Sequence, residues 1–300
     1  MAEICGSQLV SEIEHTLDVS AVKIAVLTCD IEPDFGGRTG TRELLEDASF
    51  TEQLLQRCTQ SHVPLSCFVV TSLLADALPA IRVLREKNTD LHAHSHTHDT
   101  RVYRQVSEEE IQKSQDVFSR VFGRPSLGYR APQGVMMPED IPALLRAGFQ
   151  FDASIFPARR RDVFDYRMLP REPWLWRGGV MEIPFAATPA HHRFTVSTLK
   201  LWGTFWWKKF LSNTDALPHV FVIDSHLHDF FTPTHFDQLP LSFRLLYGRN
   251  RERGFDLLAW IIATLKDHGY LFMTMSGVHA ALAEWLQSDP QEGRKRTSVS

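Results

Sequence analysis

The chain has 300 residues, of which 43% are hydrophobic and 23% are charged, and its formal net charge is −4. This composition is typical of a globular protein and provides no surplus of positive charge for a nucleic-acid backbone, so we expect no nucleic-acid partner. The sequence shows no secretory signal pattern and no run of roughly 18 apolar residues. We therefore expect a cytoplasmic protein, with reduced cysteines because the four cysteines show no CxxC spacing.

Strand-like apolar runs alternate with helical patterns along the chain. The runs lie at 22–30, 63–71, 89–94, 149–152, 180–185, 219–224 and 270–275. Such alternation predicts an α/β fold, and about seven parallel strands in this length favour a distorted (β/α) barrel. We expect an N-terminal extension over residues 1–20, a single domain over 21–287 and a disordered tail over 288–300.

Four histidines fall within seven residues at the end of the strand predicted over 89–94. Neutral imidazole is the commonest protein ligand of divalent transition metals, and a turn can aim two rings spaced four apart at one point. His94 and His98 form that pair. The alternative is a polar loop whose histidines are satisfied by their neighbours. The intervening Ser and Thr and the following Asp99 favour the metal site, since such groups orient ligand rings.

Polar side chains follow the ends of several predicted strands. They are Asp30, Glu32, His94, His98, Arg130, Asp152, His226 and His228. Each alone has an ordinary explanation, such as a helix cap or a surface ion pair, but the loops after parallel strands share one rim of a barrel. Two imidazoles and one carboxylate leave positions on a metal open for water and a substrate oxygen, which suits hydrolysis.

Five segments resemble, in order, the motifs of the polysaccharide deacetylases with a NodB-homology domain (carbohydrate esterase family 4). They begin with Thr28-Cys29-Asp30-Ile31-Glu32, His94-Ser95-His96-Thr97-His98 and Tyr129-Arg130-Ala131-Pro132, and continue with Gly148 to Pro157 and Val222 to His226. The second fits the pattern H-[ST]-x-x-H and the third fits R-x-P. The fourth is similar to a segment of the branch linked to exopolysaccharide synthesis. The resemblance implies a NodB-like barrel over about residues 22–280.

The resemblance also implies catalytic roles. Asp30 would be the base, and Arg130 would pair with it while Asp152 braces Arg130. The backbone N–H of Gln133 would help to hold the oxyanion. In this interpretation the planar guanidinium group of Arg130 lies between the two carboxylates and orients the base.

The metal ligands implied by the resemblance are Glu32, His94 and His98, holding one divalent ion that we expect to be zinc. The commonest first motif has two adjacent acids, whereas here Ile31 follows the base. The carboxylate ligand is therefore Glu32 or, as the alternative, Asp34. Related imidazole and carboxylate sites accept several first-row metals.

The last motif leaves two histidines to consider as the general acid. The exopolysaccharide branch has a His-Pro-Trp-Glu run, and His226-Leu227-His228-Asp229 matches it with His226 first. His226 would then protonate the leaving amine. His228 would lie on the wall of the acyl pocket, and Asp229 would orient an imidazole.

Two further stretches bear on the substrate. Residues 199–211 combine aromatic residues with three lysines, so they are either a sugar-stacking wall that includes Trp206 or a peripheral contact with anionic lipid at the inner membrane face. The alternative is a barrel helix whose apolar face lies in the core. Arg159-Arg160-Arg161 would meet a carrier phosphate or, as we expect, be solvated.

The resemblance implies a metal-dependent hydrolase that removes an N-acyl group, most simply acetyl, from an amino sugar of a polysaccharide, oligosaccharide or lipid-linked glycan precursor. One alternative is a C–N hydrolase of the same superfamily acting on a cyclic imide or ureide, as an allantoinase does. Another is a catalytically silent glycan-binding module. The sequence makes no prediction of the oligomeric state.

Overall fold

The computed structural model describes residues 3–288, and seven parallel strands within them form its centre. In spatial order these are β12 (Val220–Ile223), β3 (Ile24–Ile31), β4 (Leu65–Val69), β5 (Asp90–Ala93), β6 (Gly128–Tyr129), β7 (Phe151–Asp152) and β11 (Met181–Glu182). Every neighbouring pair runs parallel. The α/β fold class predicted from the sequence is thereby confirmed.

The two ends of this parallel set are linked. Phe185, which follows β11, forms a parallel bridge with Val222 of β12, and the N–H of Ala186 donates to the Val222 carbonyl at 3.0 Å. β13 (Leu271–Phe272) adds in parallel to the start of β3. The C-terminal ends of the strands therefore gather around a common mouth, where the site of such a fold lies.

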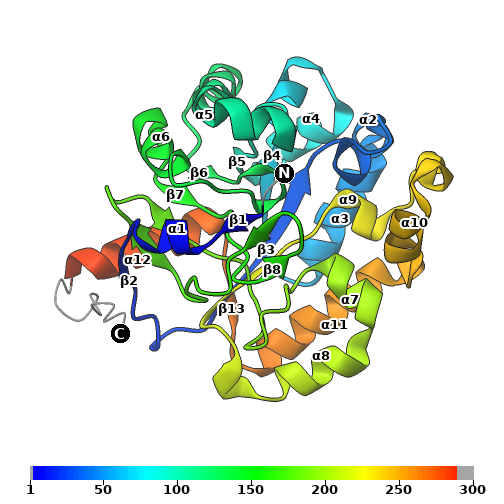
Figure 1. The fold of residues 1–300 in the computed structure, drawn as a ribbon. Coiled ribbons are helices and arrows are strands. Elements are labelled where there is room, and N and C mark those ends of the chain that lie inside the picture. Colours follow the sequence, from blue (N-terminus) through cyan, green and yellow to red (C-terminus); the bar gives the residue numbers. More distant parts are fainter. Residues whose placement is uncertain (1–2, 289–300) are drawn as a thin grey trace.

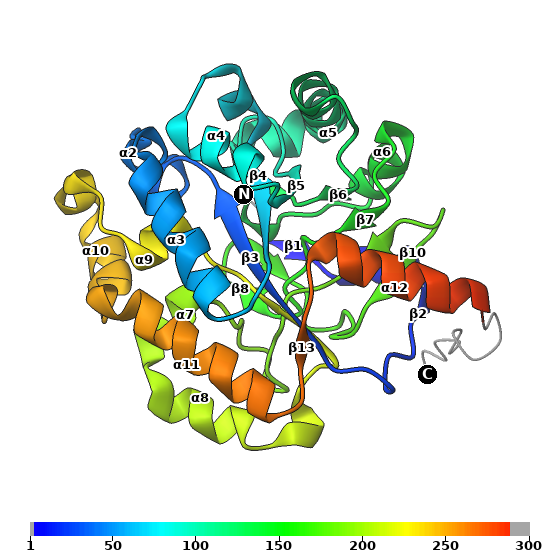
Figure 2. The same cartoon turned by 180° about the vertical axis from the view of Figure 1, so that it is seen from behind.

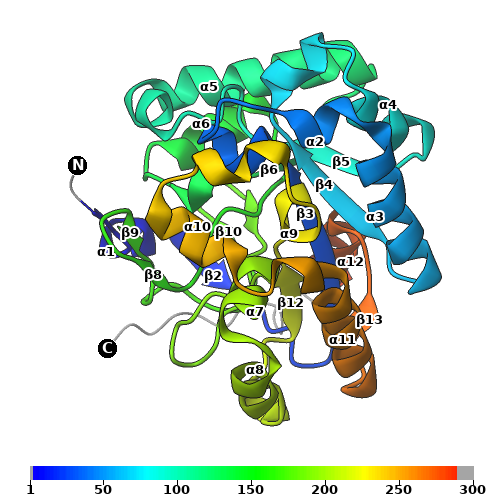
Figure 3. The same ribbon diagram turned by 90° about the vertical axis from the view of Figure 1, so that its right-hand side faces the viewer.

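Helices cover the outside of the strands (Figures 1 and 2). The longer ones are α3 (Ala48–Gln60), α4 (Pro79–Glu86), α5 (Thr100–Phe122), α6 (Asp140–Ala147), α11 (Gly254–Asp267) and α12 (Met275–Ser288). In Figure 3, α9 (Leu227–Phe230) and α10 (Leu241–Gly248) lie toward the viewer, above α7 (Val196–Trp202) and α8 (Thr204–Leu211). None of the helices within residues 3–288 is long and apolar enough to cross a membrane.

The segment predicted as an N-terminal extension is built into the fold. β1 (Ile4–Cys5) pairs with β9 (Phe164–Asp165), which also pairs with β8 (Arg159–Arg160). After α1 (Ser7–Val10), β2 (Ile13–Thr16) pairs antiparallel with β10 (Trp174–Trp176) at the edge of the main sheet. The predicted tail lies, apart from residue 288, outside the described residues.

The sequence of β3 explains how the mouth receives its acids. All eight residues of the strand are buried, as expected of a parallel strand covered on both faces. Alternate residues of a strand share a face, so Thr28, Asp30 and the next such position, Glu32, project to the same side. The Thr28 hydroxyl donates to the Ile223 carbonyl at 3.0 Å, which fixes that side toward β12.

Candidate active site

Glu32, His94 and His98 bring their ligand atoms together at the mouth. These atoms lie within 4.8 Å of one another, and all three residues are buried. His98 Nε2 is 2.7 Å from Glu32 Oε2, and His94 Nε2 is 3.7 Å from the same oxygen. Two imidazoles and one carboxylate form a group that can hold a metal ion.

The orientation of His94 supports a cation in this group. Its Nδ1–H donates to the Arg130 carbonyl at 3.0 Å, so the lone pair of the neutral ring lies on Nε2. That lone pair faces Asp30 Oδ2 at 3.4 Å and Glu32 Oε2 at 3.7 Å. Lone pairs and carboxylate oxygens repel one another in a buried site, and a bound divalent cation would remove the repulsion. The residues present therefore fit a metal.

The turn that carries the second imidazole has a strained backbone. His98 and Ser95 both lie in the left-handed region, with φ of 61° and 55°. The Ser95 hydroxyl accepts a hydrogen bond from the His98 N–H at 3.2 Å, which stabilises the turn. Such strain costs roughly 1–3 kcal/mol per residue and persists where the surroundings require it, commonly at functional sites.

Asp34, the alternative carboxylate ligand, is used elsewhere. Its Oδ2 accepts hydrogen bonds from the Thr41 hydroxyl at 2.9 Å and the Glu43 N–H at 2.7 Å. Its Oδ1 accepts from the Leu44 N–H at 3.3 Å. These bonds fix the loop to the start of α2 (Glu43–Glu46), so the geometry favours Glu32 as the ligand.

Arg130 holds Asp30 from the loop after β6. Its Nη1 donates to Asp30 Oδ1 at 2.5 Å and to the Thr28 hydroxyl at 3.1 Å. The rings of Phe68 and Phe185 lie 3.8 and 4.3 Å from the guanidinium carbon, which restricts the fork to one position. This arrangement occupies Oδ1 of Asp30 and leaves Oδ2 directed toward the metal group.

The second carboxylate beside Arg130 is not the one predicted. Among the described residues, Asp30 and Asp224 lie within ion-pair distance of its guanidinium, Asp224 at 3.7 Å. Asp152 of β7 instead adjoins Glu182 of β11. Burial raises the pKa of both of these carboxyls, so the pair shares a proton. Among the described residues no hydrogen bond or ion pair joins the Asp152 carboxyl to Arg130, although their charges interact.

The sequence analysis missed Asp224. Burial raises the pKa of its carboxyl to about 7. The available signal was its position directly after the apolar run of β12 and two residues before His226, because alternate residues of an extended chain share a face. An acid that ends a strand two residues before a candidate catalytic histidine is itself a candidate site residue.

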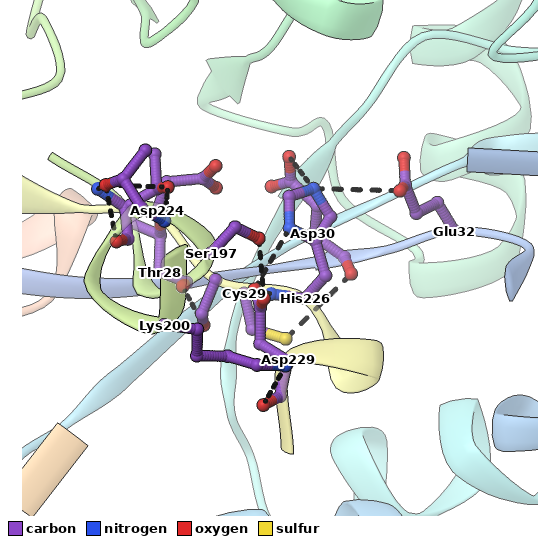
Figure 4. Close-up of polar contacts among 12 residues, drawn as sticks. Thr28, Cys29, Asp30, Glu32, Ser197, Lys200, Asp224, His226 and Asp229 are labelled. Atoms are coloured by element: carbon purple, nitrogen blue, oxygen red, sulfur yellow. Dashed lines mark hydrogen bonds and ion pairs between the residues drawn. The ribbon is translucent and has the colours of Figure 1, made fainter. Parts of the chain in front are cut away.

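His226 lies near Asp30 and Glu32 (Figure 4). Its backbone N–H donates to Asp229 Oδ2 at 3.0 Å, and its Nδ1 lies 3.4 Å from the same oxygen. Its Nε2 is 3.6 Å from Glu32 Oε1 and 3.9 Å from Asp30 Oδ2. Burial disfavours the charged ring, but Asp224, Glu32 and Asp229 together raise the pKa of His226 well above its usual value. Nε2 is therefore the atom positioned to give up a proton.

Asp229 is itself held from α7. The Ser197 hydroxyl donates to Asp229 Oδ1 at 2.6 Å, and the Lys200 ammonium donates to the Asp229 backbone carbonyl at 3.0 Å (Figure 4). Burial alone would raise the pKa of the Asp229 carboxyl, but His226 and Lys200 hold it well below its usual range. Asp229 thus remains a carboxylate that orients the imidazole of His226.

A family comparison bears on this geometry. Residues 20–151 match the family model described as polysaccharide deacetylase. The matched segment includes the metal group and the Asp30–Arg130 pair. Over this segment, which is less than half of its length, the chain is similar to the polysaccharide deacetylases. The polysaccharide deacetylases are a hydrolase family, and a place of this chain in their exopolysaccharide-associated branch stays a prediction. A comparison with curated proteins finds no match to this sequence.

Solved structures share the fold of this protein. A Mycobacterium smegmatis protein assigned to the polysaccharide deacetylases aligns over 96% of this chain and 99% of its own, at 15% identity and a TM-score of 0.58. A Pseudomonas aeruginosa PAO1 protein with the same assignment covers 90% and 93%, at 13% identity and 0.57. Puue allantoinase covers 90% and 92%, also at 13% and 0.57. The fold alone therefore does not separate the two chemistries.

The candidate site opens into a cavity of about 330 Å³, whose lining includes Gln133 and His228. The ring of His228 stacks on that of His226 with centroids 4.7 Å apart, and it also lies 4.8 Å from Phe35. Burial, with the neighbouring His226, lowers the pKa of His228 to about 3. His228 is therefore a neutral wall of the pocket near neutral pH.

Trp206, predicted as a substrate contact, lies outside this pocket. It is 61% exposed and lines a separate surface groove with Trp202 and Phe210. Trp207, in contrast, is 2% exposed and belongs to the core. The aromatic stretch therefore has two faces. One face of α8 packs in the core, as the alternative interpretation predicts, and Phe205 and Trp206 are directed outward.

Proposed function

We propose that this protein removes an N-acyl group, most simply acetyl, from an amino sugar of a polysaccharide, oligosaccharide or lipid-linked glycan precursor, using one divalent ion, zinc. The observation that supports this most is that Asp30 and His226 face the group of Glu32, His94 and His98 across one mouth. If the protein is cytoplasmic, the substrate is an internal saccharide or a carrier-linked precursor.

Glu32, His94 and His98 would hold the ion. When bound, it polarises the acyl carbonyl and lowers the pKa of a water molecule toward neutrality. Asp30 Oδ1 is engaged by Arg130, so Oδ2 is the oxygen that would take the proton of the attacking water. Removal of that proton makes the water a sufficiently strong nucleophile for an amide carbon.

The C–N bond breaks once its nitrogen carries a proton. We propose that His226 Nε2 supplies it, because Asp229 binds the Nδ1 side and leaves Nε2 facing the pocket. The backbone N–H of Gln133 would stabilise the oxygen that becomes negative during attack. The products are a free amine on the sugar and a carboxylate such as acetate.

Acetate release tests this proposal. Zinc-loaded protein should release acetate from N-acetylglucosamine oligosaccharides, and it should not open the rings of allantoin or succinimide. Ring opening without acetate release would favour the cyclic imide or ureide function, for which the allantoinase of similar fold is the supporting observation. Saccharide binding without either reaction would favour the silent binding module.

The two histidines at the end of β12 should respond differently to truncation. His226→Ala is expected to lower kcat by roughly 10²–10⁴-fold, the usual contribution of a positioned acid. His228→Ala should mainly raise KM, because the pKa of His228 near 3 leaves it neutral. Steady-state kinetics across pH measure both effects. An alkaline limb lost only in the His228 variant would make His228 the acid.

We also propose a peripheral contact of α8 with anionic lipid. Phe205 is 79% and Trp206 61% exposed, while Lys208 and Lys209 are also exposed. Phe205→Ala with Trp206→Ala should lower co-sedimentation with phosphatidylglycerol vesicles at least about tenfold, since each buried aromatic contributes roughly 1.5–3 kcal/mol. Leu271→Ala, at an apolar residue of β13 that is 72% exposed, is the control. Equal sedimentation of both variants would contradict this contact.

A further inference from the structure

Besides Arg130, three arginines line the pocket that contains the catalytic candidates. Arg38 follows the turn after β3, Arg160 ends β8, and Arg193 lies at the end of a hairpin after β11. Each of these side chains is half-buried. Their segments are distant in sequence, so the fold brings three guanidinium groups to one cavity of about 330 Å³.

None of these three guanidinium groups forms an ion pair with a carboxylate of residues 3–288. The two arginines next to Arg160 in sequence behave differently. Arg159 pairs with Glu3 at 2.8 Å, and Arg161 lies 3.8 Å from Asp162. The run predicted to be solvated therefore sends only its middle residue, Arg160, into the pocket, where Glu32 acts on its charge but no described carboxylate lies within ion-pair distance.

The guanidinium groups of Arg160 and Arg193 have few other partners, whereas that of Arg38 is held by its neighbours. Arg38 donates to the Phe35 carbonyl at 2.6 Å and lies 4.7 Å from the Phe243 ring, so packing accounts for much of its position. Arg160 makes one long hydrogen bond, 3.5 Å, to the Gln133 carbonyl. The guanidinium of Arg193 lies 5.8 Å from an aromatic ring and makes no hydrogen bond to another described residue.

The positive charges also act on one another. Burial, followed by the charges of Arg193 and Arg38, lowers the pKa of Arg160 to about 10. Like charges held together in a half-buried site destabilise it, and a bound anion reverses that effect. The planar guanidinium fork matches the oxygens of a carboxylate or phosphate. The unpaired fork atoms of Arg160 and Arg193 are thus suited to an anionic ligand.

We propose that Arg160 and Arg193 form an anion subsite of this pocket, with Arg38 adding to its positive potential. The inference rests on the proposed function and narrows it, because the acylated amino sugar would carry a carboxylate or a phosphate. Ligand pockets span roughly 300–1,000 Å³, so a cavity of about 330 Å³ is a small one. The anionic group therefore belongs to the reacting sugar or to its neighbour.

Turnover of three acylated sugars tests the substrate class. These are neutral N,N′-diacetylchitobiose, N-acetylglucosaminuronic acid and N-acetylglucosamine 1-phosphate. One of the two anionic sugars should show a kcat/KM at least about tenfold above that of the neutral sugar, because a hydrogen bond to a charged group contributes enough binding free energy for such a factor. Preference for the uronate identifies a carboxylate, and preference for the sugar phosphate identifies a phosphate. Equal kcat/KM values for all three overturn the inference.

Substitutions assign the preference to the arginines. Arg160→Gln and Arg193→Gln should each lower the ratio of anionic to neutral kcat/KM about tenfold, mainly through KM. Arg161→Gln is the matched control, since that side chain is exposed and lies next to Asp162, and its ratio should stay unchanged. If a Gln variant does not fold, the corresponding Lys variant should lower the ratio by a smaller factor. An unchanged ratio at both positions overturns the subsite.

Titration with inorganic phosphate separates failure of this inference from failure of the proposed function. If no sugar releases acetate, the proposed function fails, but phosphate binding that is lost in Arg160→Gln or Arg193→Gln still supports the subsite. Absence of phosphate binding overturns it when neither anionic sugar is preferred. Binding that neither variant changes also overturns it, because the phosphate then occupies another position such as the metal.

Discussion

Asp30→Asn should lower kcat by at least about 10²-fold and leave the metal content unchanged. Proton transfer by a positioned base contributes roughly 10²–10⁴-fold, and an amide cannot accept the proton of the attacking water. The metal should stay because Glu32, His94 and His98 form a complete ligand group without Asp30. Single-turnover kinetics and metal analysis of the same preparation measure both quantities. Wild-type kcat in this variant would exclude Asp30 as the base.

The partner of the base provides a second test of the same arrangement. Arg130→Lys should also lower kcat, since one ammonium cannot keep the geometry by which Nη1 binds Asp30 and Thr28 while the guanidinium packs between two rings. Its thermal stability should be measured alongside, because Arg130 is 1% exposed. A stable Lys variant with full kcat would show that the orientation of Asp30 does not depend on the fork.

The sequence predicts the local parts of this site because they depend on strand periodicity. β3 is apolar throughout and ends in the acids, so a period of two puts Asp30 and Glu32 on one side without knowledge of any other element. The same reasoning accounts for the departure from two adjacent acids, since adjacent residues of a continuing strand would face opposite ways. His94 and His98 likewise follow from one turn.

Contacts between distant elements could not be predicted in the same way. The carboxylate next to Arg130 is Asp224, because β12 pairs with β3 when the parallel strands come together around the mouth. Asp152 is nearer to Arg130 in sequence but faces Glu182 across a neighbouring strand pair. The choice between these two acids depends on strand order, which hydrophobic patterns do not specify.

Orientation within the aromatic and basic runs was equally hidden. α8 has four aromatic residues in eight positions, so its sequence does not indicate which face of the helix is buried. Periodicity therefore could not predict that Trp206 is exposed and Trp207 is buried. Lys200 is 2% exposed and donates to the Asp229 carbonyl, although a lysine in such a run is usually solvated. The interaction partner of a charged side chain in the fold, and not its residue type, decides whether that side chain is buried or solvated.

Removal of either metal imidazole should lower metal affinity by more than about 100-fold. Losing a partner of a ligand costs 10–100-fold, and losing the ligand itself costs more. Purified His94→Ala and His98→Ala should therefore retain little zinc after desalting, and both should lose turnover. Because a metal that binds only the folded chain stabilises it, added zinc should raise the Tm of the wild type and not that of these variants.

The same histidine run contains the matched control. His96 is also buried, but its Nδ1 lies 3.1 Å from the Thr71 hydroxyl and outside the ligand group. His96→Ala should therefore keep its zinc and the zinc-dependent rise in Tm, whatever it does to the basal Tm. Loss of zinc from all three variants would indicate that the turn, and not the ligand set, was tested. Zinc retained in His94→Ala and in His98→Ala would exclude this site, because a carboxylate and one imidazole alone leave the ion too few protein ligands.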